Sequence, residues 1–259
     1  MKLTNDNYFS TEANKAYMSA SQFKDFMKCE AAALARVNGE YSEQATTPLL
    51  VGSYVDAYFS GELETFNETH PEIFNKRTGE LKADYRKADK LIERIERDSV
   101  FMEALSGDTQ KIMTGELFGV PFKIKMDSYF EGERIVDLKV LRDMKGAYKN
   151  SEWKPFVDAW GYDIQGYIYQ QIVLQNTGKE LPFYLAVITK EDPPNIEIIH
   201  IPQWKLNSVA AIVGHYAERF QSIKQGNTEP ERCGQCPYCY ETKVLTGAVE
   251  YEDIIETDY

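Results

Sequence analysis

Long apolar runs and a secretory leader are both missing from this sequence. No apolar run approaches the length that a membrane-spanning helix needs. The first ten residues, MKLTNDNYFS, contain no hydrophobic segment of a signal peptide. Internal repeats, low-complexity linkers and the phosphate-binding pattern G-x-x-x-x-G-K-[S/T] are absent as well, so the chain is not itself a P-loop helicase. We therefore expect a cytoplasmic protein that does not interact with membranes.

Cysteine is scarce, with 4 residues in 259, yet Cys233, Cys236 and Cys239 follow one another in the pattern C-x2-C-x2-C. Without a secretory signal, disulfide bonds are not the expected use of these thiols. The spacing suits one face of a [4Fe–4S] cluster, with Cys29 as the remaining candidate for the fourth ligand. Tetrahedral zinc held by four thiolates is the alternative. The simplest interpretation is that three of the thiols bind no metal and that Cys29 is merely buried.

Positive charge is in deficit, because the formal net charge is −12. Proteins that bind nucleic acids more often carry a basic face, so this balance argues against tight nonspecific binding to DNA. Basic residues are nevertheless frequent between 123 and 154, namely Lys123, Lys125, Arg134, Lys139, Arg142, Lys145, Lys149 and Lys154. Much of the acid lies in the tail, 250–259, for which we favour a role in solubility. A basic cleft in an acidic body is compatible with this distribution.

The order of the expected elements indicates a mixed α/β protein. Hydrophobic periodicity and capping residues predict three helices, over 18–39, 47–61 and 83–98. The first is expected to end at Gly39, and a loop is expected at 62–81. Three consecutive antiparallel strands are expected near 109–117, 120–130 and 134–140. A short helix or connection at 141–150 then leads to a helix over 157–176, strands over 181–190 and 195–201, and a helix over 204–226.

These elements predict one domain that spans residues 1–259. It comprises a helical N-terminal part (1–105), a core with a central mixed β-sheet flanked by helices (106–226), and a cysteine loop with the acidic tail (227–259).

Two carboxylates and a lysine on the second and third strands could hold a divalent metal against a phosphodiester. Because side chains alternate along a strand, Asp137 and Lys139 face one way and Leu138 faces the core. An antiparallel partner brings Asp127 alongside. Mg²⁺ prefers oxygen ligands, so the two carboxylates and the Leu138 carbonyl could bind it, and Glu116 could be a further ligand or base. The simpler interpretation is a cross-strand charge pair on a solvent-exposed face.

Four motifs occur in an order that resembles the PD-(D/E)XK nuclease superfamily, and within it the RecB-like and phage RecE-type exonucleases. They are GSYVD (52–56), GVPFKIKMD (119–127), IVDLK (135–139) and QGYIY (165–169). The resemblance implies a restriction-endonuclease-like fold, with Asp127 and Asp137 as ligands of Mg²⁺ or Mn²⁺ and Lys139 as the catalytic lysine. Gln165 and Tyr169 correspond to residues that position the DNA strand and this lysine, although Tyr169 could also be a core residue.

One position departs from the motif. Asp56 stands where RecB-like enzymes have histidine; an Asp can still ligate a metal, or it can be an exposed helix residue. The basic residues Lys123, Lys125, Arg142 and Lys145 are the expected DNA contacts.

The resemblance also implies a substrate and partners. RecE-type enzymes resect ends of double-stranded DNA 5′→3′ and leave 3′ single strands for an annealing protein in phage recombination, and such enzymes often form rings. The implied setting is a bacterial or phage-infected cell. A CRISPR-adaptation-type nuclease and a non-cleaving DNA-binding module derived from a nuclease are the alternatives.

The segment MSASQFKDFMKCE (18–30) resembles the upstream cysteine segment of AddB-type nucleases. In those enzymes one cysteine precedes the core and three follow it, and together they bind an iron–sulfur cluster. The resemblance therefore implies that Cys29, Cys233, Cys236 and Cys239 hold a metal centre whose role is structural rather than redox.

Overall fold

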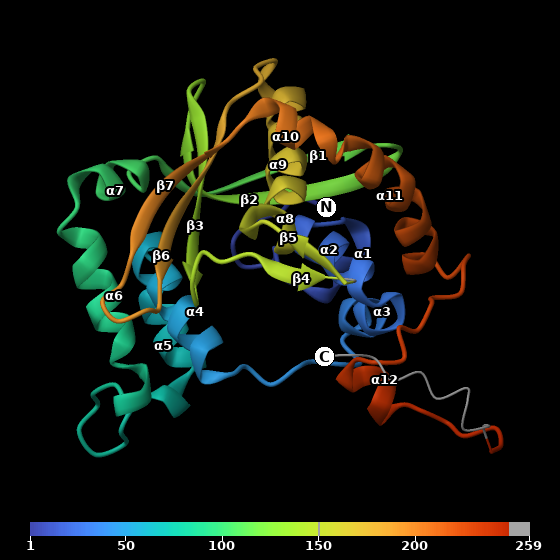
Figure 1. Cartoon of the computed structure of the whole chain (residues 1–259), viewed down its shortest axis with the longest axis horizontal. Coiled ribbons are helices and arrows are strands. Elements are labelled where there is room, and N and C mark those ends of the chain that lie inside the picture. Colours follow the sequence, from blue (N-terminus) through green and yellow to red (C-terminus); the bar gives the residue numbers. More distant parts are fainter. Residues whose placement is uncertain (150, 249–259) are drawn as a thin grey trace.

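One mixed sheet of five strands forms the centre of the molecule, in the spatial order β1-β2-β3-β6-β7 (Figure 1). The computed structural model describes residues 1–149 and 151–248. Strands β1 (Asp108–Leu117), β2 (Val120–Phe130) and β3 (Arg134–Leu141) form the expected antiparallel meander. Strand β6 (Phe183–Thr189) lies parallel to β3, and β7 (Ile196–Ile201) returns antiparallel to it. The predicted mixed α/β fold is confirmed.

The segment between β3 and β6 supplies the longest helix of the core. It contains a small hairpin, β4 (Ala147–Lys149) with β5 (Glu152–Lys154), where the sequence predicted a short helix or a plain connection. The helix predicted over 157–176 is divided into α8 (Phe156–Ala159) and α9 (Tyr162–Thr177). The break lies at Gly161, whose backbone is left-handed with φ of 62°, a conformation that glycine adopts without steric cost.

The helices cover both faces of the sheet and create two apolar cores (Figure 1). One face packs on α9, α2 (Ala20–Lys28), α10 (Gln203–Ser208) and α11 (Ala210–Lys224), through residues such as Ile135 and Leu185. The other packs on α4 (Thr47–Ser60), α6 (Lys87–Glu96) and α7 (Ser99–Ala104), through residues such as Val136 and Leu138. Leu138 therefore faces the core, as its position on the strand predicted.

The helix predicted over 18–39 is in fact two helices, α2 and α3 (Glu30–Asn38). Its predicted ends are correct, because Ser19 Oγ accepts a hydrogen bond from Gln22 N and Gly39 closes α3 with φ of 78°. The interruption is Cys29, which is extended with φ of −162° and ψ of 109°. The expectation of one continuous helix is therefore wrong at the residue that carries the thiol.

Short helices fill segments that the sequence left irregular. They are α1 (Thr11–Ala16), α5 (Leu63–Thr69) in the predicted loop, and α12 (Pro237–Glu241) in the cysteine segment. Single 3-10 turns occupy Pro71–Ile73 and Ala83–Tyr85. The predicted acidic tail, 250–259, lies outside the described residues. Within the described chain, no helix combines the length and the apolar character needed to cross a membrane.

Candidate active site

The candidate site lies where strands β2 and β3 part. Their paired residues run from Phe130↔Arg134 to Ser128↔Val136, and within the described chain the ladder goes no further. Strand β3 then continues without β2 and remains paired with β6 as far as Leu141. The first residues beyond the last pair are Asp127 and Asp137. Asp127 Oδ2 accepts a hydrogen bond from Leu138 N at 2.8 Å and so satisfies a main-chain donor that the ladder leaves unpaired.

Asp137 is buried, with 2% of its surface exposed, and both of its oxygens face polar groups. Oδ1 accepts a hydrogen bond from Gln165 Nε2 on α9 at 2.7 Å. Oδ2 forms an ion pair with the ammonium of Lys139, and no other described group donates a hydrogen bond to it. The Lys139 ammonium compensates the charge of this buried oxygen, and a divalent cation could do the same, because carboxylate oxygens are its preferred ligands; the arrangement therefore fits a metal ligand.

Helix α9 holds this carboxylate in place. Gln165 and Tyr169 lie one turn apart, and the Tyr169 hydroxyl donates a hydrogen bond to the Lys125 carbonyl at 3.0 Å. Gly166 lets the helix approach the sheet, because a Cβ there would lie 2.6 Å from Phe183 Cδ1. The helix thus connects both strands of the site through Asp137 on β3 and the β2 backbone.

The charges at the site perturb one another strongly. Burial raises the pKa of Asp127 well above its usual range, and the neighbouring carboxylates of Asp137 and Asp56 raise it further. Burial also raises the pKa of Asp56 to about 6, although Lys139 opposes the shift. For Lys139 itself burial acts to lower the pKa, but Asp137 and Asp127 outweigh it and raise the pKa. A divalent cation would favour the ionised form of these carboxylates, because metal ligands bind deprotonated.

These groups open into a cavity of 590 Å³, within the range of small-ligand sites. Its titratable lining is balanced: the acids are Asp25, Asp56, Glu62, Asp127 and Asp137, and the bases are Arg36, Lys123, Lys125, Lys139 and Lys190. In a chain with a net charge of −12, this cavity is formally neutral. A bound divalent cation would make it positive and attractive to a phosphate.

The four predicted DNA contacts lie in different surroundings. Lys123 lines the cavity but is 1% exposed; its ammonium donates to Asn14 Oδ1 at 2.8 Å and to the Tyr8 carbonyl, and burial lowers its pKa to about 8. Lys125 also lines the cavity and pairs with Glu62 at 3.5 Å. Arg142 and Lys145 are exposed and do not line it.

Glu116 is not brought to the other acids. It is exposed on β1, where its neighbour across the ladder is Pro121. Pro121 lies six residues before Asp127 on β2, which corresponds to about 20 Å of strand. A direct role for Glu116 at the Asp127–Asp137 pair does not fit this position.

Several residues at the cavity carried no recognised sequence signal. Tyr8 and Phe9 reach it from the segment before α1, Arg36 from α3, and Lys190 from the residue after β6. Lys190 had a detectable signal, since a ligand-binding residue often follows a buried strand at its carboxyl end. For Tyr8, Phe9 and Arg36 we find none, because their place depends on how distant segments fold back.

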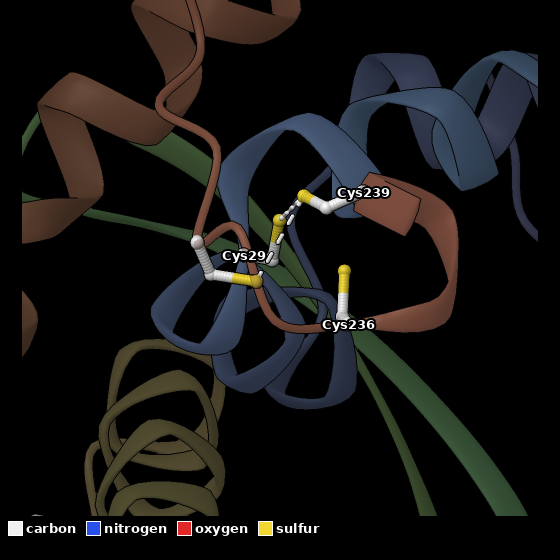
Figure 2. A group of neighbouring side chains, drawn as sticks. Cys29, Cys236 and Cys239 are labelled. Atoms are coloured by element: carbon white, nitrogen blue, oxygen red, sulfur yellow. Dashed lines mark hydrogen bonds between the residues drawn. The ribbon is translucent and has the colours of Figure 1, made fainter. Parts of the chain in front are cut away.

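The structure brings all four cysteines together, as predicted (Figure 2). The four sulfur atoms lie within 4.8 Å of one another, and a thiolate-bound metal fits such a group. Burial raises the pKa of Cys29 and raises that of Cys236 to about 12. For Cys233, amide donors from Gln235 and Cys236 overcome the effect of burial and lower the pKa to about 7. Among the described residues, the cavity lining includes none of these cysteines.

Comparisons with other proteins agree with this geometry. The model of the family described as "PDDEXK-like domain of unknown function (DUF3799)" matches residues 19–242. A crystal structure of a "Putative exonuclease" from Eubacterium rectale is 46% identical, with 98% of each chain covered and a TM-score of 0.93. The comparison with curated proteins gave no match. With a match of that extent, and the Asp127–Asp137–Lys139 constellation in place, the chain belongs to the PDDEXK-like DUF3799 family.

Proposed function

We propose that this protein is a Mg²⁺- or Mn²⁺-dependent exodeoxyribonuclease. The observation that carries the proposal is the buried Asp137 carboxylate, which is ion-paired with Lys139 and lies with a second carboxylate, Asp127, where strands β2 and β3 part. This is the donor set of a hard divalent cation next to a group that can neutralise a phosphate. The kinship with a protein called a "Putative exonuclease" supports the same reaction class.

The residues that would hold the cation are Asp127, Asp137 and Asp56, with the Leu138 carbonyl as a further oxygen. A bound divalent ion would act as a Lewis acid on the phosphoryl oxygens and neutralise their charge. The cavity would then attract the DNA backbone despite the acidic composition of the chain.

Lys139 and Gln165 have separable roles in this proposal. The raised pKa of Lys139 keeps its ammonium charged at neutral pH, so it stabilises negative charge on the phosphate rather than accepting a proton. Gln165 is a positioning residue, because its amide donates a hydrogen bond to Asp137 Oδ1 and so fixes this carboxylate.

The resemblance to RecE-type exonucleases favours 5′→3′ resection of double-stranded ends, a 3′ single-stranded product and an annealing protein as partner. A ring of several chains around the duplex would agree with processive resection. Substrates blocked at one end determine the polarity, because 5′→3′ resection stops only when the 5′ end is blocked. A mixing experiment with a single-strand annealing protein would test the partner.

Cleavage of end-labelled duplex with Mg²⁺ or Mn²⁺ tests the activity. We expect degradation by the wild-type protein, a loss of about 100-fold or more for Asp137→Ala and for Lys139→Met, and retained DNA binding. Arg77→Ala, an exposed residue that does not line the cavity, is the matched control and should cleave normally. A wild-type protein that binds DNA but leaves blunt, nicked and single-stranded substrates intact with both ions would be a non-cleaving binding module instead.

A further inference from the structure

The sulfur geometry points to a single tetrahedral Zn²⁺ ion at the four cysteines, rather than a [4Fe–4S] cluster, and to a role for this ion in fixing one wall of the active-site cavity. The sulfur of Cys239 lies 3.7 Å from that of Cys29 and 3.9 Å from that of Cys233. Zinc–sulfur bonds of about 2.3 Å place the corners of a regular tetrahedron about 3.8 Å apart. These two separations match that value, and no other pair of the four sulfur atoms exceeds it by more than about 1 Å.

A cubane cluster requires a larger site. Its thiolates lie roughly 6 Å apart, because the iron and sulfide atoms of the cube occupy the space between them. Here no two of the four sulfur atoms are more than 4.8 Å apart, so every pair would have to separate. Cys29 and Cys239 are buried at 6% and 3% exposure and pack with Ala31 and Ala32, which resists that expansion.

The backbone around Cys233 is arranged for a compact ligand turn. The amide of Gln235 donates to Cys233 Sγ at 3.5 Å, and Gly234 between them adopts the left-handed conformation with φ of 74°. Cys236 follows three residues after Cys233, a spacing that structural zinc sites use. Figure 2 shows Cys236 and Cys239 approaching Cys29 from the C-terminal segment.

Ion pairs hold the two arms of the site together independently of a metal. Glu30, next to Cys29, accepts hydrogen bonds from Arg219 on α11 at 2.6 and 2.8 Å and from Glu231 N at 2.7 Å. Ala31 N donates to the Glu231 carbonyl at 3.0 Å. These bonds join the start of α3 to the segment that leads into Cys233. The close sulfur spacing is therefore imposed by the surrounding fold and does not depend on a free loop.

The proposed ion would act on the cavity through the joint between α2 and α3. Cys29 is both the C-cap residue of α2 and the N-cap residue of α3, and its side chain makes no capping hydrogen bond to α3. Asp25 on α2 and Arg36 on α3 line the cavity, so the angle at Cys29 sets their separation. This part of the inference rests on the proposed function, whereas the identity of the metal does not.

Metal analysis of the wild-type protein tests the identity of the ion. The protein is purified under anaerobic conditions from cells supplied with both iron and zinc. We expect one zinc per chain, no acid-labile sulfide and no absorption near 400 nm. Replacement by Co²⁺ should give the strong visible bands of a tetrahedral thiolate site. About four irons and four sulfides per chain would overturn the assignment, as would a wild-type protein with no metal at the cysteines.

The effect on the cavity wall is tested with Cys236→Ser. Cys236 is the N-cap residue of α12 and is less buried than Cys239 within that helix, and Tyr238→Phe on the same turn is the matched control. DNA affinity is measured in the presence of Ca²⁺ in place of Mg²⁺, since a binding measurement does not require cleavage. We expect loss of zinc and a loss of affinity of about tenfold for Cys236→Ser, with the control unchanged and the Mg²⁺ affinity of both intact. Unchanged DNA affinity in the zinc-free variant would overturn the role at the wall. Absence of cleavage by the wild type would contradict the proposed function alone.

Discussion

Asp56 offers the sharpest test of whether the first motif belongs to the active site. In Asp56→Asn the side chain keeps its shape but cannot ionise. The wild-type carboxyl has a pKa of about 6 in the fold against 3.8 when unperturbed, chiefly because it is buried. Each unit of pKa difference is worth about 1.4 kcal/mol, so ionised Asp56 lowers the free energy of unfolding by at most about 3 kcal/mol.

The direction of the Asp56 pKa shift determines the pH range over which the free energy of unfolding changes. Below pH 3.8 the carboxyl is protonated in both folded and unfolded chains and adds no cost. As the pH rises from there through about 6, the unfolded chain loses its proton first, so the wild-type protein loses stability relative to Asp56→Asn. Above this window the difference stays constant. We therefore expect the variant to be more stable by about 1 to 3 kcal/mol at pH 8 and by almost nothing at pH 4.

Urea unfolding in EDTA between pH 4 and pH 8 measures this difference, and Asp84→Asn, at an exposed acid in a 3-10 turn, is the control. Addition of Mg²⁺ should then stabilise the wild type more than Asp56→Asn, because the variant lacks one anionic oxygen ligand. A difference that does not change with pH, together with equal stabilisation by Mg²⁺, would mean that Asp56 is only a helix residue at the edge of the site.

Three further changes test how the site is supported. Gln165→Leu removes the hydrogen bond to Asp137 and should lower kcat by about 10- to 100-fold with little change in KM for DNA, measured by steady-state cleavage; equal kcat would refute the positioning role. Gly166→Ala should destabilise the fold by about 1 to 3 kcal/mol in urea unfolding, since its Cβ would meet Phe183 at 2.6 Å; a neutral result would show that α9 can shift. Lys123→Met should lower the unfolding midpoint but leave DNA affinity unchanged, because its ammonium bonds inside the protein; a selective loss of DNA affinity would contradict this.

The strand pattern predicted which residues of 135–139 share a face, because that inference depends only on local geometry. Alternation along 135–139 places Asp137 and Lys139 on one side and Leu138 on the other whatever the rest of the chain does. The structure confirms this: Leu138 packs in the core beside α4 and α6, and Asp137 meets Lys139. The split between β2 and β3 was not predicted. It depends on β6 pairing with β3 beyond the point where β2 departs.

Where the sequence misled, a contact between distant segments decided the outcome. The stretch around Cys29 has good helix formers on both sides, so propensity favours one helix. The observed break coincides with two hydrogen bonds to a residue some two hundred positions away: Ala31 N donates to the Glu231 carbonyl, and Glu231 N donates to Glu30 Oε2. Lys123 was an expected DNA contact, yet the segment of Tyr8 and Asn14 folds over it and accepts its hydrogen bonds. No local sequence pattern predicts either of these long-range contacts.

The acidity of the chain and the chemistry of the site are compatible for one electrostatic reason. Without a cation, Asp127 and Asp56 resist ionisation because each is buried near Asp137. The same proximity that raises their pKa concentrates carboxylate oxygens where a divalent ion can replace the protons. With these acids ionised by the bound ion, the acids and bases of the lining balance, so the net positive charge would be concentrated on the ion itself, next to the phosphate. Affinity for DNA at this site should therefore depend on the metal far more than on surface lysines, and a net charge of −12 is no obstacle to a nuclease of this design.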